Sequence, residues 1–168
     1  MRVGVIPDIH GNENFEIKVK SLQEANVDKI VFLGDYFDSH DPDDNFLVQR
    51  KCFNRVLELK NSNPDFYTIL LGNHDIHYLT RLGASSTSNK QWEHATEIQE
   101  LLLQNRQKFD AVFVADNWIF SHAGVTSNWK KRWFDDKTFS DINKTLQASK
   151  NISCFNWQGL DPYGDDPI

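Results

Sequence analysis

Leu71-Gly72-Asn73-His74-Asp75 directly follows an apolar run at residues 66–71, which predicts a fully buried strand that ends in a turn. The glycine allows the backbone to turn sharply, and the next three residues present an amide oxygen, an imidazole and a carboxylate. Open α/β sheets bind their ligands beyond the carboxyl ends of the strands. Alone, such a cluster is more often a capped turn than a functional site.

Three other stretches with metal-ligand side chains also follow short apolar runs. They are Asp8-Ile9-His10, Gly34-Asp35-Tyr36-Phe37-Asp38 and Ser121-His122-Ala123-Gly124. Each single aspartate or histidine has an ordinary explanation as a turn, cap or buried residue. The occurrence of all four stretches in one chain, each after a predicted strand, indicates a shared site.

Strands alternate with helices along the first half of the chain. The predicted strands are residues 2–7, 29–33 and 66–71, and the predicted helices are residues 15–25 and 45–61. This alternation predicts parallel βαβ units, whose loops would lie at the same edge of an open sheet. Beyond them we expect one or two helical turns at 76–82, a helix at 91–109, a hairpin of strands 111–115 and 118–121, and a helix at 141–150.

Length and charge limit the classes of function. The 168 residues are most simply one domain, residues 1–168. A net charge of -6 disfavours a general nucleic-acid surface. Anionic substrates would also be repelled, unless bound cations reverse the local field.

The two cysteines, Cys52 and Cys154, lie far apart and form no CxxC pair, which disfavours a zinc-thiolate site. We expect reduced thiols in a cytoplasmic protein. The first strand begins near the N-terminus, and no apolar run approaches the ~20 residues that span a bilayer. We therefore expect no membrane association.

The candidate ligands combine imidazole, carboxylate and amide groups. Asp8 and His10 are two residues apart and would point the same way in an extended segment, while Asp35 could bridge two ions. This mixed set suits Mn, Fe or Zn better than Ca or Mg, and we favour Mn. Two ions that share a carboxylate lie ~3.5–4 Å apart, hold a bridging hydroxide and bind phosphate oxygens.

His74 directly follows the candidate ligand Asn73, so we expect it to face the substrate and to protonate a leaving oxygen. Such an acid needs a nearby carboxylate, for which Asp38 is the candidate. Asp75 is an alternative partner, or a cap of the following helix. We expect His77 and Tyr78 to pack rather than to approach the site.

The four motifs resemble those of the metallophosphoesterase (calcineurin-like phosphoesterase) superfamily, D-x-H, G-D-x-x-D, G-N-H-[DE] and a later histidine motif. The Ser121 to Gly124 form is similar to the branch with Ser/Thr phosphatases and dinucleoside tetraphosphate hydrolases. The resemblance implies an α/β (α+β) fold with a two-sheet β-sandwich core flanked by helices, which revises the open sheet. It implies one metal ion on Asp8, His10 and Asp35, and a second on Asp35, Asn73 and His122. It also implies that His74 and Asp38 form the acid pair.

The chain departs from the family pattern at two places. Ser39-His40 stands where the branch usually has an Arg-Gly pair that binds phosphate, and His40, Arg81 or the basic residues 130–132 are the possible substitutes. No histidine follows His122, whereas the family usually has a final G-H motif. The site therefore takes a ligand from elsewhere, or the C-terminal part of the domain is incomplete.

The leading hypothesis is a dinuclear-metal phosphoesterase that hydrolyses a phosphate monoester. The expected substrate is a phosphorylated small molecule, a nucleotide or a phosphoprotein. One alternative is a phosphodiesterase or a dinucleotide or nucleic-acid hydrolase of the same superfamily. Another is a non-catalytic domain that binds metal or a partner and lacks the last ligand.

Overall fold

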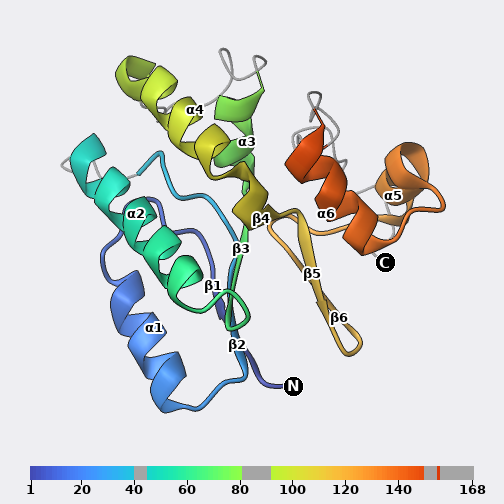
Figure 1. Cartoon of the computed structure of the whole chain (residues 1–168), viewed down its shortest axis with the longest axis horizontal. Helices are drawn as coiled ribbons and strands as arrows, with labels where there is room; N and C mark the ends of the chain where they lie inside the picture. The colour runs from blue at the N-terminus through green and yellow to red at the C-terminus, as the bar shows by residue number, and fades with distance from the viewer. Residues whose placement is uncertain (40–44, 81–91, 150–154, 156–168) are drawn as a thin grey trace.

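The computed structural model describes residues 1–39, 45–80, 92–149 and 155, and is built on a four-stranded parallel sheet (Figure 1). The strands are β1 (Val3–Ile6), β2 (Lys29–Phe32), β3 (Tyr67–Leu70) and β4 (Phe109–Asp110), and they lie in the order β1-β2-β3-β4. Val3 pairs with Lys29 and Ile30 with Tyr67. The predicted parallel arrangement is confirmed, so the loops that follow β1, β2 and β3 leave from one edge.

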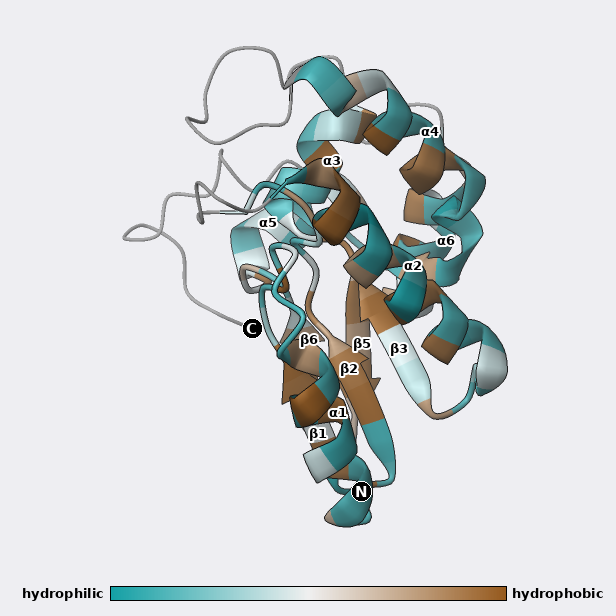
Figure 2. Ribbon diagram, turned by 90° about the vertical axis from the view of Figure 1, so that its left-hand side faces the viewer, coloured by the Kyte–Doolittle hydropathy of each residue, from teal (hydrophilic) through white to brown (hydrophobic). Residues whose placement is uncertain are grey.

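Two helices lie together on one side of this sheet, α1 (Phe15–Glu24) and α2 (Phe46–Ser62) (Figure 1). Helix α1 packs closely against β1. A Cβ built on Gly4 of β1 would lie only 2.8 Å from a methyl carbon of Leu22 of α1. Strand β2 is hydrophobic after its first residue, and α2 mixes hydrophobic and hydrophilic residues along its length (Figure 2). These are the patterns of a strand buried on both faces and of a helix with one buried face.

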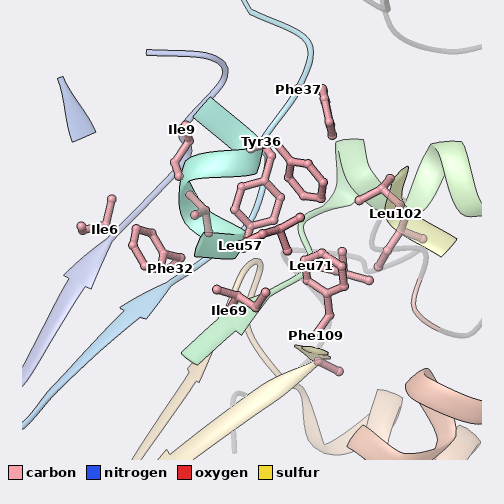
Figure 3. Close-up of a cluster of buried hydrophobic side chains, with 14 of the residues drawn as sticks. Ile6, Ile9, Phe32, Tyr36, Phe37, Leu57, Ile69, Leu71, Leu102 and Phe109 are labelled. Atoms are coloured by element: carbon pink, nitrogen blue, oxygen red, sulfur yellow. The ribbon is translucent and has the colours of Figure 1, made fainter. Parts of the chain in front are cut away.

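Aromatic side chains connect this core to the loop after β2. Tyr36 and Phe37 belong to that loop, yet both are fully buried and point into the hydrophobic cluster beside α2 (Figure 3). The Phe53 ring of α2 lies 5.4 Å from Tyr36 and 5.0 Å from Phe37, between ring centroids. Burial of each such side chain stabilises the fold by about 1.5–3 kcal/mol. The loop that carries Asp35 and Asp38 is therefore anchored to α2 by the two aromatic residues between them.

A second sheet consists of β5 (Val112–Ala115) and β6 (Trp118–Ser121), which pair antiparallel. The predicted hairpin is confirmed, and Asp116 in its turn has a φ of 51°. Helices α5 (Ser127–Phe134) and α6 (Phe139–Ala148) lie near this hairpin (Figure 1). Asn143 of α6 accepts from the Val112 amide (3.1 Å) and donates to the Val112 carbonyl (2.8 Å). The fold is thus mixed α/β, with a parallel sheet, a second antiparallel sheet and flanking helices, as the resemblance implied.

Three predicted helices have wrong boundaries. Helix α3 (Asn73–Leu79) begins at Asn73, three residues before the predicted start, because the Asp75 carboxylate accepts from the Gly72 amide and closes the first turn. Helix α4 (Ala95–Gln104) is shorter than predicted and lies between short 3₁₀ turns at Trp92–His94 and Arg106–Lys108. The predicted helix also ran through Phe109, which instead begins β4. The predicted last helix began at 141, but Thr138 and Asp141 form a capping box that starts α6 at Phe139.

No helix within the described part of the chain combines the length and apolar character needed to cross a bilayer.

Asp110 in β4 gives the fold a pH dependence. Burial raises the pKa of Asp110 above its ordinary 3.8, although Lys60 and Lys29 oppose the shift. The folded state then holds the proton more tightly than the unfolded chain, so this contribution to stability falls as the pH rises from 3.8 through the folded pKa. Asp110→Asn removes this titration and keeps an acceptor for Gln147, whose Nε2 lies 3.2 Å from Asp110 Oδ1. We expect the variant's free energy of unfolding to increase relative to wild type as the pH rises from 3.8 through the folded pKa of Asp110. Urea denaturation measures this difference, and a difference that shrinks as the pH rises would contradict the assignment.

Candidate metal centre

The five predicted metal ligands come together at the carboxyl edge of the parallel sheet. Asp35 lies in both ligand clusters found among the described residues, His10–Asp35–His74 and Asp8–Asp35–His122, and in each the ligand atoms lie within 4.8 Å of one another. The Nε2 atom of His122 is 2.7 Å from Asn73 Oδ1 and 3.3 Å from Asp35 Oδ2. The predicted role of Asp35 as the carboxylate common to two metal positions agrees with this placement.

The division of the ligands between two ions is less simple than the resemblance implied. Asp8 Oδ1 lies 3.7 Å from His122 Nδ1, so the structure groups Asp8 with the ligand assigned to the other ion. His10 Nε2 lies 3.7 Å from Asp35 Oδ2. Asn73 does lie beside His122, at 2.7 Å, but the implied division of the ligands between two ions stays a prediction.

Backbone carbonyls fix the tautomers of two histidines. His10 Nδ1 is 2.7 Å from the Phe37 carbonyl, and His122 Nδ1 is 3.1 Å from the Leu33 carbonyl. A carbonyl only accepts, so each Nδ1 carries its proton and each neutral ring leaves the Nε2 lone pair directed elsewhere. Histidine ligands in metal sites are commonly held by such contacts to the second nitrogen. Both rings are therefore prepared to coordinate through Nε2.

The donor atoms themselves indicate a cation. With Nδ1 protonated, neutral His122 offers a lone pair at Nε2, which faces the oxygens of Asn73 and Asp35 at 2.7 and 3.3 Å. Three electron-rich atoms at these distances require either a proton or a shared metal ion. Imidazole, amide and carboxylate together suit Mn, Fe or Zn. The residues present therefore fit a divalent metal, whose identity the geometry leaves open.

The electrostatics of Asp35 agree with this conclusion. Burial raises the pKa of Asp35 to about 6, and Asp8 and Asp38 add to the shift, while His74 opposes it. Positive charge nearby stabilises the ionised form of a carboxylate in such surroundings. A bound cation supplies that charge.

Backbone conformations in the site are unusual. Four of the six non-glycine residues with positive φ in the described part of the chain are site residues: Asp8 (20°), His10 (44°), Asp35 (54°) and Asp38 (63°). Aspartate and histidine tolerate this region better than most residues, but each still costs of order 1–3 kcal/mol. Such strain persists where the surroundings hold the backbone firmly, and it is concentrated at functional sites.

Asp75 supplies much of that restraint. Its buried carboxylate accepts from the amides of Asp35 (2.8 Å), Tyr36 (3.0 Å) and Gly72 (2.9 Å). The amide of His74 donates in turn to Asp35 Oδ1, at 2.9 Å. Of the two roles considered for Asp75, the structure shows the helix cap, and it extends that role to a link between two loops.

The two residues predicted to form the acid pair are in contact. His74 Nδ1 donates to Asp38 Oδ2 at 2.8 Å, and the Asp38 side chain is fully buried. The hydrogen bond to Asp38 raises the pKa of His74, although burial opposes the shift. The His74 ring lies 5.1 Å from the His10 ring and also belongs to one candidate ligand cluster. His74 is therefore placed either to donate a proton or to bind metal.

Sequence reasoning missed the contact of Tyr78. The predicted burial is correct, but the Tyr78 hydroxyl also donates to Asp38 Oδ1. The available signal was the spacing, since Tyr78 follows His74 by four residues and shares its helix face once α3 begins at Asn73. His77 is also buried, and its ring lies 6.3 Å from that of His74.

The possible substitutes for a phosphate-binding arginine are only partly described. His40 and Arg81 lie outside the described residues. Lys130 to Arg132 belong to α5, where Lys130 Nζ donates to the Asp135 carbonyl at 2.8 Å. No assignment of a phosphate-binding residue follows from these contacts.

Comparison with known proteins agrees with the motifs. Residues 1–165 match the family model of the calcineurin-like phosphoesterases. The chain is also similar to a solved metallophosphoesterase from Sphaerobacter thermophilus, with 25% sequence identity and a TM-score of 0.42. That match covers 71% of this chain and 45% of the other, so the chain spans less than half of that protein. No curated protein matches the chain.

The backbone turns at Gly34 and Gly72 lie in close contact, and this contact yields a stability prediction. A Cβ at Gly34 (φ 108°) would lie 2.2 Å from the Gly72 nitrogen, whereas Gly124 (φ 90°) has nothing within 4 Å. Gly34→Ala should lower the free energy of unfolding by about 2–5 kcal/mol, from strain and steric overlap together. Gly124→Ala, the matched control, should cost only the strain, about 1–2 kcal/mol. Equal losses in chemical denaturation would show that the contact does not constrain the turn.

The shared carboxylate yields a prediction for metal content. Asp35→Asn should weaken the binding of both ions, because Asp35 belongs to both ligand clusters. His74→Asn should retain them if His74 is the acid. Elemental analysis after saturation with Mn and dialysis measures the number of ions per chain. Loss of metal from His74→Asn would instead identify His74 as a ligand.

Proposed function

The chain belongs to the calcineurin-like phosphoesterase family, and we propose that it is a dinuclear-metal phosphatase that hydrolyses phosphate monoesters. The observation that carries the proposal is the position of Asp35 in two ligand clusters at one sheet edge. Such a shared carboxylate suits two ions held close together. The proposed ligands are those implied by the motifs: Asp8, His10, Asp35, Asn73 and His122.

The protein's own groups prepare this site in three ways. The Nε2 atoms of His10 and His122 are directed as ligands by the carbonyls at Nδ1. The Asp35 carboxylate is oriented by the His74 amide. Two divalent ions, when bound, supply an activated water and neutralise charge on the phosphate. Because the chain has a net charge of -6, this neutralisation is also what admits an anionic substrate.

His74 is the proposed general acid. The hydrogen bond to Asp38 raises the pKa of His74 and so favours the protonated ring. Because Asp38 contacts Nδ1, Nε2 is the nitrogen proposed to deliver the proton. As the phosphorus–oxygen ester bond breaks, its electron pair passes to the leaving oxygen, which takes that proton. The oxygen of water forms the new bond to phosphorus and loses a proton to solvent.

The finer parts of the proposal have separate supports. Mn is proposed as the native metal because the donor set is mixed. The proposed substrates are phosphorylated small molecules, nucleotides or phosphoproteins. A cytoplasmic location is proposed from the reduced thiols expected of the two cysteines, of which Cys52 is buried.

Hydrolysis of p-nitrophenyl phosphate by Mn-loaded protein tests the proposal. We expect metal-dependent turnover. On phenyl phosphate, whose leaving oxygen needs a proton, His74→Asn should reduce turnover ~10²–10⁴-fold while metal content is retained. A parallel assay with bis-p-nitrophenyl phosphate separates the ester classes, and a preference for the diester would replace the monoesterase by a phosphodiesterase. Protein with two bound ions and no turnover on either ester would favour a non-catalytic domain.

A further inference from the structure

The buried Asp38 carboxylate contacts two side chains of the same helix. His74 Nδ1 donates to Oδ2 at 2.8 Å, and the Tyr78 hydroxyl donates to Oδ1. His74 and Tyr78 are four residues apart on α3, so they lie on one face, a single turn apart. Each oxygen of the carboxylate thus receives a donor from a different turn of one helix.

Tyr78 is itself held firmly. Its side chain is 6% exposed, and its ring packs edge-on against Phe37 with centroids 6.4 Å apart. Its carbonyl accepts from Gln99 Nε2 of α4 at 2.7 Å. Phe37 directly precedes Asp38 and is fully buried, so ring and hydroxyl of Tyr78 contact consecutive residues of the loop after β2. The hydroxyl position is therefore set by the core and by α4.

We propose that Tyr78 is a positioning residue that fixes the Asp38 carboxylate, and through it the His74 ring, for proton transfer to the leaving oxygen. This role rests on the proposed phosphoesterase function. Rotation of a carboxylate about its side-chain torsions would turn an imidazole bonded to it. A donor on each oxygen restricts that rotation. Small displacements of an acid have large effects, because proton transfer requires hydrogen-bond distance to the reacting atom.

Tyr78 is not proposed as a catalytic residue. Its hydroxyl is directed at Asp38 in the interior, and its burial keeps it from the substrate. Its effect should therefore depend on how much the reaction needs an acid. An ester with a weakly basic leaving group, such as p-nitrophenolate, needs little protonation, whereas phenolate needs more.

The test compares Tyr78→Phe with wild type on phenyl phosphate and p-nitrophenyl phosphate, with Mn-loaded protein. We expect kcat on phenyl phosphate to fall about tenfold, the loss of one hydrogen bond to a charged group, with little change in KM. The kcat on p-nitrophenyl phosphate should change much less, and metal content should stay the same. If wild type prefers diesters, the corresponding diphenyl and bis-p-nitrophenyl esters replace the pair.

Tyr67→Phe is the matched control. Tyr67 is also buried, and its hydroxyl accepts from Gln23 Nε2 at 2.7 Å, at the opposite end of β3 from the site. It should leave both rates unchanged. Asp38→Asn should remove the effect of Tyr78→Phe in the double variant, because Tyr78 acts through Asp38.

A measurement without metal or substrate checks the same contact. In metal-free protein labelled with ¹⁵N-histidine, the NMR signal of the His74 Nδ1–H should shift or broaden in Tyr78→Phe and not in Tyr67→Phe. Equal rate losses on both esters, no loss on either, or additive effects with Asp38→Asn would overturn the role, as would unfolding of Tyr78→Phe. Failure of wild type to hydrolyse any ester would instead overturn the proposed function.

Discussion

The hydrogen bonds of the Asp75 carboxylate hold together the two loops on which the candidate centre depends. Three backbone amides, from Gly72, Asp35 and Tyr36, donate to this one buried side chain. The loops approach so closely that neither Gly34 nor Gly72 leaves room for a Cβ, since Asp35 Oδ1 lies 2.0 Å from one built on Gly72. The glycines permit this contact and the carboxylate stabilises it. The Asp35 carboxylate and the His74 ring are brought together as a result.

This arrangement brings several carboxyl groups close together, which is electrostatically unfavourable. Asp8, Asp35, Asp38 and Asp75 gather in a small volume, and burial raises the pKa of Asp75 to about 7, with the charge of Asp35 adding to the shift. Four strained backbone positions add to the cost. The apolar core supplies the compensation, because Tyr36 and Phe37, which lie between Asp35 and Asp38 in the chain, bury their rings in the hydrophobic cluster. Divalent ions would relieve the remaining repulsion.

The sequence predicted the elements and the convergence of the site well, and the reason is topological. Parallel strands have all their carboxyl ends at one edge. The motifs after β1, β2 and β3 therefore come together there, regardless of the sequence between the strands. Contacts formed only by tertiary packing were not predictable in the same way. The two residues of β4 are specified by pairing with β3, where the Leu71 amide donates to the Asp110 carbonyl at 3.2 Å, rather than by a local pattern. The early start of α3, and with it the contact of Tyr78 with Asp38, follows from the Asp75 link. The positive φ values at Asp8 and His10 have no local sequence signal, such as a glycine at the position, that would have predicted them.

His122 shows why the second sheet matters to a site on the first. It follows β6, and its ring is held by the Leu33 carbonyl, which is 89 residues earlier in the chain and directly follows β2. The position of this ligand therefore depends on the hairpin, and the hairpin in turn depends on α6 through Asn143. An ion bound between His122 and Asp35 would join the two sheets directly. Because a ligand that binds only the folded state stabilises it, metal binding and the docking of the second sheet should be thermodynamically coupled. With an ion bound, the candidate centre would thus also be a structural link, in which the candidate ligand His122 joins the two sheets.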